Sequence, residues 1–371
     1  MVSDVLIVGA GPAGLAVGGA LAMAGQPSVL FERGPSAGTA WHHHYARLHL
    51  HTVKELSALP GLPFPPDAPR YVPRQGVADY LAAYAAHYRL ELRYGQAVTR
   101  IVRDGAGWQV HMVDGTAHRS HAIVLATGAN ATPVRPALPG ETGFGGRILH
   151  SHAYRDASPF AGQRVLVVGM GNTGAEIALD LAEAGVATTV SVRSPINVVR
   201  RDVLGRPTQR TAMLLAKLPP AWGDRLGVWL RDLTVGDLTP LGLRTPALSP
   251  LRQLRETGRT PVIDLGTLDL IRAGRIAVRP GVRTLTPTGV QFTDGREEAF
   301  DALLLATGYR PAVQALFPDL ALPVDARGLP REVVGTGDAA GLYFVGFELT
   351  RPGGLLNTIA DQARTVARTL A

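Results

Sequence analysis

The chain has 371 residues, a formal net charge of +7 and no cysteine. This length exceeds what a single hydrophobic core usually supports and fits two domains of about 150 residues each. The lack of cysteine excludes structural disulfides, thiolate metal sites and redox-active dithiols. Lysine is scarce and the arginines are scattered, so the positive charge suits acidic small molecules better than nucleic acid.

Two glycine-rich turns of one design dominate the sequence, Gly9–Gly14 (GAGPAG) and Gly169–Gly174 (GMGNTG). Each follows a short apolar run and precedes an Ala/Leu-rich segment, which predicts a strand, a tight turn and a helix. Gly25 and Gly185 stand where each helix should end, and a β-rich run follows each of them. The pattern predicts two complete β-α-β units, each able to hold a pyrophosphate at a helix N-terminus.

The ends of the second strands distinguish the two nucleotides. Glu32 stands where a carboxylate can accept hydrogen bonds from ribose hydroxyls, whereas the second unit carries Arg193 and Ser194, which suit a 2′-phosphate. We therefore assign FAD to the first turn and NADPH to the second, although a solvated surface arginine is the alternative for Arg193. The residues expected to hold FAD here are Gly9, Gly11, Pro12, Ala13, Gly14, Glu32 and, through its backbone, Val98. Those expected to hold NADPH are Gly169, Gly171, Asn172, Thr173, Gly174, Arg193 and Ser194.

A second matched pair of segments, residues 122–128 and 302–308, predicts two buried strands that each end in Ala-Thr-Gly. The small Thr127-Gly128 end lets backbone pass near the dinucleotide.

The expected fold is α/β, with two Rossmann-like dinucleotide-binding domains of the three-layer ββα type. The FAD domain is discontinuous, comprising residues 1–155 and 309–371, and the NADPH domain spans 156–308 with an insertion near 200–260.

Several features bear on partners and compartment. Residues 5–24 are apolar, but the glycine turn interrupts them and no positive segment precedes them, so they indicate a buried strand and helix rather than a signal. We expect a cytoplasmic protein, monomeric or homodimeric, that binds neither membrane nor nucleic acid. The histidines at 42–44, 49 and 51 have no evident carboxylate or thiolate partner, so no metal is expected.

The segment Phe144–Tyr154 matches the F-x-G-x3-H-x3-Y signature of class B flavin-dependent monooxygenases, and both glycine turns flank it in the expected order. Within that class the chain resembles most closely the auxin-forming YUCCA flavin monooxygenases and their bacterial relatives. The stretches that carry this resemblance are FER at 31–33 with Trp41 downstream, LHLHTVKELSAL at 48–59, ATGAN at 126–130, TPVIDLGT at 260–267, IRAGRI at 271–276 and ATGYR at 306–310.

The resemblance implies an FAD- and NADPH-dependent monooxygenase that uses O2 and a C4a-(hydro)peroxyflavin to oxygenate a small organic substrate. Oxidative decarboxylation of an aromatic 2-oxo acid such as indole-3-pyruvate is the reaction of this branch. N- or S-oxygenation of a small amine or sulfide is one alternative, and an NADPH-dependent flavin reductase that passes electrons to a protein partner is another. The chain departs from the plant-type pattern near residues 34–39, in 348–354 and in the insertion, where we expect the substrate pocket to be shaped.

The resemblance also suggests roles for particular residues. Arg33 and Trp41 are expected near FAD, and His51 occupies the position at which the wider family often has a flavin-facing asparagine. We predict His51 and Asn130 as the catalytic residues, with His51 donating a hydrogen bond near flavin N5 or the peroxide. The alternative for Asn130 is that it simply caps a turn. His150 and Tyr154 belong to the signature and are expected to couple NADPH binding to domain geometry rather than to transfer protons.

Overall fold

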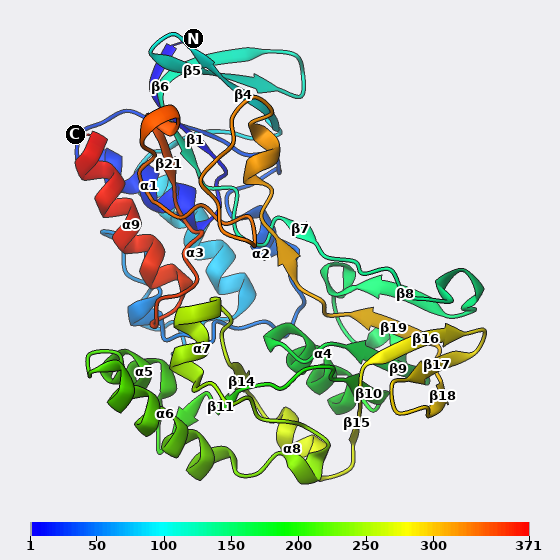
Figure 1. The fold of residues 1–371 in the computed structure, drawn as a ribbon. Helices are drawn as coiled ribbons and strands as arrows, with labels where there is room; N and C mark the ends of the chain where they lie inside the picture. Colours follow the sequence, from blue (N-terminus) through cyan, green and yellow to red (C-terminus); the bar gives the residue numbers. More distant parts are fainter. Residues whose placement is uncertain (1, 371) are drawn as a thin grey trace. The chain divides into compact units, whose positions relative to one another are not determined.

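The computed structural model describes residues 2–370, and the chain divides into two compact units (Figure 1). Unit 1 contains the residues up to His43, Thr52–Thr132, and those from Tyr309 on. Unit 2 contains His44–His51 and Pro133–Gly308. The short strands β7 (Thr132–Pro133) and β20 (Tyr309–Arg310) mark two of the places where the chain passes from one unit to the other.

The first long passage lies at residues 132/133 rather than at the expected 155/156. The reason is the strand β8 (Arg147–His150), which pairs in parallel with β19 (Ala302–Leu305) and so forms part of the sheet of unit 2. The second difference is that His44–His51, expected in the FAD domain, belongs to unit 2.

A mixed sheet forms the centre of unit 1, with the strand order β3-β2-β1-β6-β5-β4 and with β21 also paired to β6. The pairs β3-β2, β2-β1, β1-β6 and β6-β21 are parallel, whereas β4 and β5 form an antiparallel extension on the N-terminal half of β6. The strand bounds are β1 Val2–Val8, β2 Val29–Phe31, β3 Glu91–Arg93, β4 Val98–Asp104, β5 Gly107–Met112, β6 Ala117–Leu125 and β21 Leu342–Phe344.

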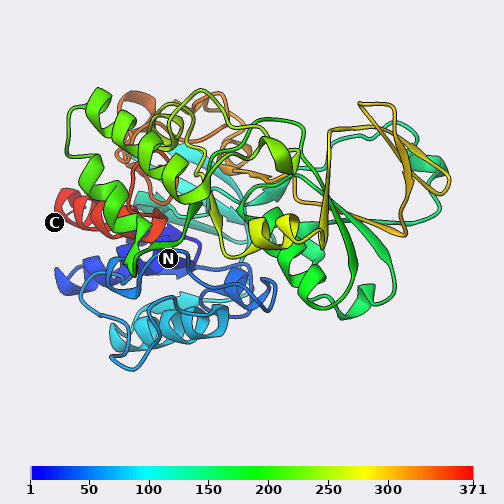
Figure 2. The ribbon, with the colours of Figure 1, turned by 90° about the horizontal axis from the view of Figure 1, so that it is seen from below.

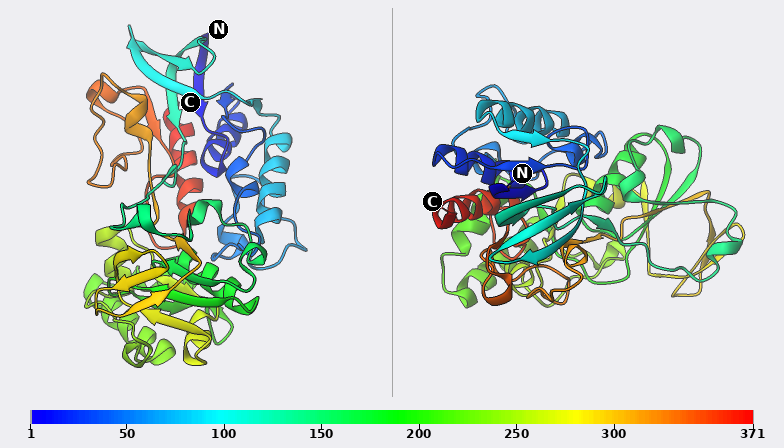
Figure 3. Two further views of the ribbon diagram at one scale, coloured as in Figure 1. Left: turned by 90° about the vertical axis from the view of Figure 1, so that its right-hand side faces the viewer. Right: turned by 90° about the horizontal axis from the view of Figure 1, so that it is seen from above.

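Three long helices accompany this sheet, α1 (Pro12–Met23), α3 (Arg74–His87) and α9 (Leu355–Leu370), and a short helix α2 spans Thr39–His42. Helix α1 packs against both α3 and α9, and Figure 3 shows α1 and α3 side by side. Buried residues run through most of α1 from Ala13 to Leu21, because the helix has neighbours on several sides and carries no charged side chain.

Unit 2 is built on a parallel sheet with the strand order β15-β10-β9-β19-β8. Helices α4 (Asn172–Glu183) and α8 (Thr267–Arg272) pack on each other, and a separate antiparallel sheet of β16, β17 and β18 appears at the right of Figure 2. The remaining bounds are β9 Arg164–Val168, β10 Ala187–Ser191, β15 Ile276–Arg279, β16 Val282–Thr286, β17 Gly289–Phe292 and β18 Glu297–Ala299.

The predicted insertion forms a helical layer of unit 2 (green in Figure 1) in which α6 packs on α5 and α7. Its elements are β11 Val198–Arg200, β12 Asp202–Val203, β13 Arg206–Pro207, α5 Thr208–Leu215, α6 Pro220–Val235, α7 Pro250–Thr257 and β14 Val262–Asp264. Strand β11 pairs with β14 in parallel and thereby closes the insertion at its base. Within residues 2–370, no helix is long and apolar enough to cross a membrane.

Candidate functional site

The two glycine turns have the same geometry. The first glycines, Gly9 and Gly169, have φ values of +107° and +100°, which favour glycine. A Cβ on Gly14 would lie 1.8 Å from the Gly9 carbonyl oxygen, and a Cβ on Gly174 would lie 2.0 Å from that of Gly169. The middle glycines, Gly11 and Gly171, have no heavy atom within 4 Å of an added Cβ. The space next to the middle glycine is thus left open in each unit, where a pyrophosphate would approach the backbone.

Each turn leads directly into a helix of 12 residues, α1 or α4. The N-caps are Gly11 and Gly171, and no side chain of the described residues caps either helix. The first backbone N–H groups of a helix have no partner within the helix, and the helix dipole favours negative charge there. Both helix N-termini therefore fit a bound phosphate.

The two Ala-Thr-Gly strand ends border the same turns. A Cβ on Gly9 would lie 2.7 Å from the Ala126 carbonyl oxygen, and a Cβ on Gly169 would lie 2.8 Å from that of Ala306. The threonines then differ. Thr307 Oγ1 donates a hydrogen bond of 2.5 Å to the Val134 carbonyl, whereas Thr127 Oγ1 is buried and has no partner within residues 2–370. A buried hydroxyl without a partner is unusual, so Thr127 fits a ligand that would complete its hydrogen bonding.

Glu32 is 8% exposed and connects the glycine turn of unit 1 to the loop that follows β2. Its Oε2 accepts a hydrogen bond of 2.8 Å from the Ala10 N–H, and its Oε1 accepts one of 2.8 Å from the Gly34 N–H. Each carboxylate oxygen retains a second lone pair that could accept from a ribose hydroxyl. Glu32 thus holds the backbone of the glycine turn and of the loop after β2, a role that the sequence did not predict.

The corresponding strand end of the second unit is cationic. Arg193 and Ser194 are exposed just after β10. Arg244, from the loop before α7, donates a hydrogen bond of 2.8 Å from Nη2 to the Arg193 carbonyl, which brings a second guanidinium to this end of the strand. The sequence did not indicate Arg244, because 51 residues separate it from Arg193.

The side chain of Asn172 is already engaged. Its Nδ2 donates to the Pro261 carbonyl at 3.2 Å, and its Oδ1 accepts from the Ile263 N–H at 2.7 Å. Thr267 Oγ1 donates to the Ala175 carbonyl at 2.9 Å. These bonds anchor the TPVIDLGT segment on the start of α4, so a phosphate contact of Asn172 would come from its backbone rather than from its side chain.

The other residues predicted around FAD lie on separate elements of unit 1. Arg33 is exposed after β2, Trp41 is half-buried in α2, and Val98 is the first residue of β4. Asn130, one of the two residues predicted as catalytic, is exposed in the turn that follows β6. None of these positions tests the predicted roles.

His51 lies in unit 2, beside helix α4. Its Nε2 is 3.3 Å from Oε1 of Glu176, a side chain of α4 that is 2% exposed. Tyr45 also contacts this helix, because its hydroxyl donates a hydrogen bond to the other carboxylate oxygen of Glu176. Sequence reasoning missed Glu176 and Tyr45, although a charged residue in an otherwise apolar stretch of helix was a detectable signal. Among the described residues, no group of three His, Cys, Asp or Glu side chains is arranged to hold a metal ion.

His150 and Tyr154, the signature residues, have defined partners in unit 2. His150 Nε2 lies 3.1 Å from the Gly308 carbonyl, and its Nδ1 accepts from the His152 N–H at 3.1 Å. Burial lowers the pKa of His150. Tyr154 donates a hydrogen bond of 2.6 Å to Asp180 on α4, and burial together with this bond raises the pKa of its phenol. Both residues thus have defined hydrogen-bond partners within unit 2.

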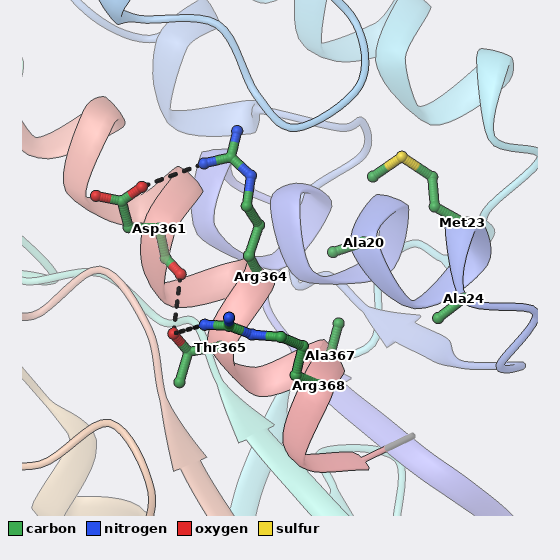
Figure 4. A pocket seen from close by; sticks show the side chains of 8 residues that line it. All are labelled: Ala20, Met23, Ala24, Asp361, Arg364, Thr365, Ala367 and Arg368. Atoms are coloured by element: carbon green, nitrogen blue, oxygen red, sulfur yellow. Dashed lines mark hydrogen bonds and ion pairs between the residues drawn. The ribbon is translucent and has the colours of Figure 1, made fainter.

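A cavity of about 540 Å³ opens between α1 and α9, and Figure 4 shows its lining. It is bordered by Ala20 and Met23 of α1 and by Ala24 just after it, at the opposite end of that helix from the glycine turn. On the α9 side, Arg364 pairs with Asp361, and Arg368 contacts Thr365. The cavity is therefore separate from the predicted nucleotide site of unit 1.

Comparison with known proteins gives concordant results. The family described as pyridine nucleotide-disulphide oxidoreductase matches residues 6–208. The chain is 39% identical to indole-3-pyruvate monooxygenase YUCCA1 of Oryza sativa subsp. japonica, over 97% of this chain and 89% of that protein. It is 38% identical to the probable indole-3-pyruvate monooxygenase YUCCA1 of Arabidopsis thaliana, over 98% of this chain and 89% of that protein.

Among solved structures, a flavin-containing monooxygenase from Stenotrophomonas maltophilia matches with a TM-score of 0.77 and 27% identity, over 100% of this chain and 98% of that one. The bacillithiol disulfide reductase of Bacillus cereus, at 19% identity and a TM-score of 0.72, shares the fold. The predicted α/β fold with Rossmann-type domains and the predicted family are both confirmed. The chain belongs to the class B flavin-dependent monooxygenases, in the branch of the YUCCA enzymes, and is an oxidoreductase.

Proposed function

We propose that the protein is an FAD- and NADPH-dependent monooxygenase that converts an aromatic 2-oxo acid, such as indole-3-pyruvate, to the acid that is one carbon shorter. The observation that carries this proposal is the pair of open glycine turns in a chain with nearly full-length similarity to enzymes named for indole-3-pyruvate. When bound, FAD reduced by NADPH would supply the electrons that activate O2.

The residues of unit 1 fit FAD on three independent observations. These are the open space at Gly11, the uncapped N-terminus of α1 and the unpartnered hydroxyl of Thr127. In this assignment the α1 amides bind the pyrophosphate and Glu32 accepts from the ribose. Arg33, Trp41, Val98 and Gly128 complete the proposed contacts.

The residues of unit 2 fit NADPH for corresponding reasons. Gly171 is open, α4 lacks a side-chain cap, and Arg244 donates a hydrogen bond to the carbonyl of Arg193 just after β10. A guanidinium binds a phosphate through paired, charge-assisted hydrogen bonds. These residues would favour a coenzyme with a 2′-phosphate over NADH, and Arg244 joins Arg193 and Ser194 in the proposal.

A turnover experiment tests this function. Purified holoenzyme is supplied with NADPH, O2 and indole-3-pyruvate, and the products are identified by mass spectrometry. Formation of indole-3-acetate and CO2 in step with NADPH oxidation is expected. A matched run with a small amine and a sulfide tests N- and S-oxygenation, and oxygenation of those compounds but not of the oxo acid would overturn the proposed substrate class. NADPH oxidation that depends on an added electron-accepting protein, with no oxygenated product, would instead favour a reductase.

A further inference from the structure

The segment His44–His51 is fastened to helix α4 by side chains of one helical face. Glu176, Asp180 and Glu183 follow one another at spacings of four and three residues, which places them on the same side of α4. Glu176 accepts from Tyr45, Glu183 pairs with Arg47, and Asp180 accepts from Tyr154. The Ala46 N–H also donates to the Arg155 carbonyl at 2.8 Å. His51 therefore lies beside α4 at the end of a short segment that is held by contacts of Tyr45, Ala46 and Arg47.

Glu176 differs from the other two acids because it is buried, at 2% exposure, whereas the Glu183 side chain is 49% exposed. A carboxylate removed from water needs hydrogen-bond donors for its oxygens. Tyr45 supplies one donor to Oε2. For Oε1 the nearby candidate is His51 Nε2, which lies within ion-pair distance at 3.3 Å. Both atoms are buried and neither has a hydrogen-bond partner among the described residues, so each remains available to the other.

This pairing has a chemical consequence for the imidazole. An ionised carboxylate only accepts hydrogen bonds, so a ring nitrogen that faces it must carry a proton. A neutral His51 whose proton is on Nε2 has a lone pair on Nδ1. The ring is not sealed off, because the side chain of His51 retains 16% of its exposure.

We infer that Glu176 is a positioning residue that holds the proton of His51 on Nε2 and so makes Nδ1 a proton acceptor during oxygen transfer. The inference rests on the proposed function for its role in the reaction, but the pairing itself can be tested without turnover. It revises the expected role of His51, because a neutral ring held in this way accepts a proton at Nδ1 and cannot donate one there. The proton that Nδ1 takes up would come from the oxygen that attacks the substrate, which is thereby deprotonated, and the carboxylate of Glu176 would stabilise the resulting imidazolium, as in other carboxylate–histidine pairs.

The two candidate reactions differ in whether the attacking oxygen must be deprotonated. Attack on the carbonyl carbon of a 2-oxo acid requires a nucleophilic, deprotonated oxygen, whereas oxygenation of an amine or sulfide requires an electrophilic, protonated one. A proton acceptor at His51 Nδ1 favours the first case. With His51 at the reacting oxygen, as predicted from the sequence, the Glu176–His51 pair would favour an oxo acid rather than an amine or sulfide as the substrate class.

The first test is spectroscopic and uses the holoenzyme labelled with ¹⁵N-histidine. The chain has 11 histidines, so His51 is assigned by the signals that disappear in His51→Ala. The expected result is a protonated Nε2 and an unprotonated Nδ1 in the wild type. Glu176→Gln should convert this pattern to a mixture of tautomers, because an amide can accept from or donate to the ring. A wild-type His51 with its proton on Nδ1 would overturn the inference, even if Glu176→Gln fails to fold.

Glu183→Gln is the matched control, since it makes the same chemical change on the same face of α4 at an exposed ion pair. It should leave the His51 signals and turnover unchanged. Tyr45→Phe removes the other donor to Glu176 and should also leave the proton on Nε2. A loss of the tautomer in all three variants would indicate a general loosening of the segment and would contradict a specific role for Glu176.

The second test follows coupling, measured as product formed and hydrogen peroxide released for each NADPH oxidised. Glu176→Gln should lower coupled turnover by roughly 10-fold or more. Combining it with His51→Ala should add little to the effect of His51→Ala alone, because the two residues act as one unit. Normal coupling in Glu176→Gln would overturn the role in the reaction. If the wild type forms no oxygenated product but shows the expected tautomer, the proposed function fails while the pairing stands.

Discussion

The two β-α-β units share one backbone design and differ in the side chains of the helix that follows the turn. Gly9, Gly11 and Gly14 repeat the conformations and close contacts of their counterparts in the second turn. Helix α1, however, is apolar and packed against α3 and α9, whereas Glu176 and Glu183 of α4 bind side chains of the segment His44–His51. The comparison shows that the same backbone turn is combined with different side chains on the helix that follows it, so the turn alone does not distinguish the two units.

The largest expected effect comes from the third glycine of either turn. In Gly14→Ala the new methyl group would meet the Gly9 carbonyl oxygen at 1.8 Å, which forces the turn and α1 apart. We expect a loss of at least about 3 kcal/mol in the free energy of unfolding, measured by thermal or denaturant unfolding. Gly11→Ala is the control, because its methyl group meets nothing within 4 Å. Equal stability of the two variants would show that the turn can relax.

A larger side chain at the middle glycine should separate the two nucleotides. Gly11→Val is expected to fold but to be purified without bound FAD, since the side chain occupies the phosphate approach. Gly171→Val should retain FAD and lose binding of NADP⁺, measured by calorimetry. If Gly171→Val lost the flavin and Gly11→Val kept it, the assignment of the two turns would be reversed.

The cationic end of β10 should govern the choice of coenzyme. Arg193→Ala should raise KM for NADPH by about 10- to 100-fold and KM for NADH much less, because charge-assisted hydrogen bonds to the 2′-phosphate are lost. Arg244→Gln should have the same direction and a smaller size, as one of its donors already serves the Arg193 carbonyl. Equal effects on the two coenzymes would remove these arginines from the phosphate site.

The smallest effect concerns acid stability, for which each unit supplies one histidine. Burial lowers the pKa of His118 in unit 1, helped by Arg93, and burial lowers that of His150 in unit 2. The unfolded chain then binds more protons below about pH 6.5, so the stabilisation is complete above that pH and is lost as the pH falls.

His118→Gln and His150→Gln should each reduce the loss of unfolding free energy between about pH 6.5 and 5 by a small amount, below about 1 kcal/mol, measured by denaturant unfolding at each pH. If the two units unfold in separate transitions, His118→Gln should change only the transition of unit 1 and His150→Gln only that of unit 2. Steeper acid sensitivity in either variant would contradict the predicted sign.

The sequence predicted the parts of the fold that depend on local patterns. The glycine spacing indicated both turns, and the apolar runs indicated the strands that precede them. It did not predict that residues 44–51 belong to unit 2, because the contact of Tyr45 with Glu176 joins residues 131 positions apart. It also gave Thr127 and Thr307 the same local motif, although only Thr307 has a carbonyl acceptor from a segment far away in the chain. Whether the predicted FAD and NADPH residues bind as assigned stays a prediction.

The interleaving of the two units has a consequence for how the protein is made. The chain changes unit four times, and the last part of unit 1 begins at Tyr309. Strand β21 and helix α9, which pair with β6 and pack on α1, are therefore translated only after all of unit 2. During synthesis unit 2 can be completed first, while the first half of unit 1 waits with an open sheet edge at β6. For the same reason no single cut in the chain releases either unit whole.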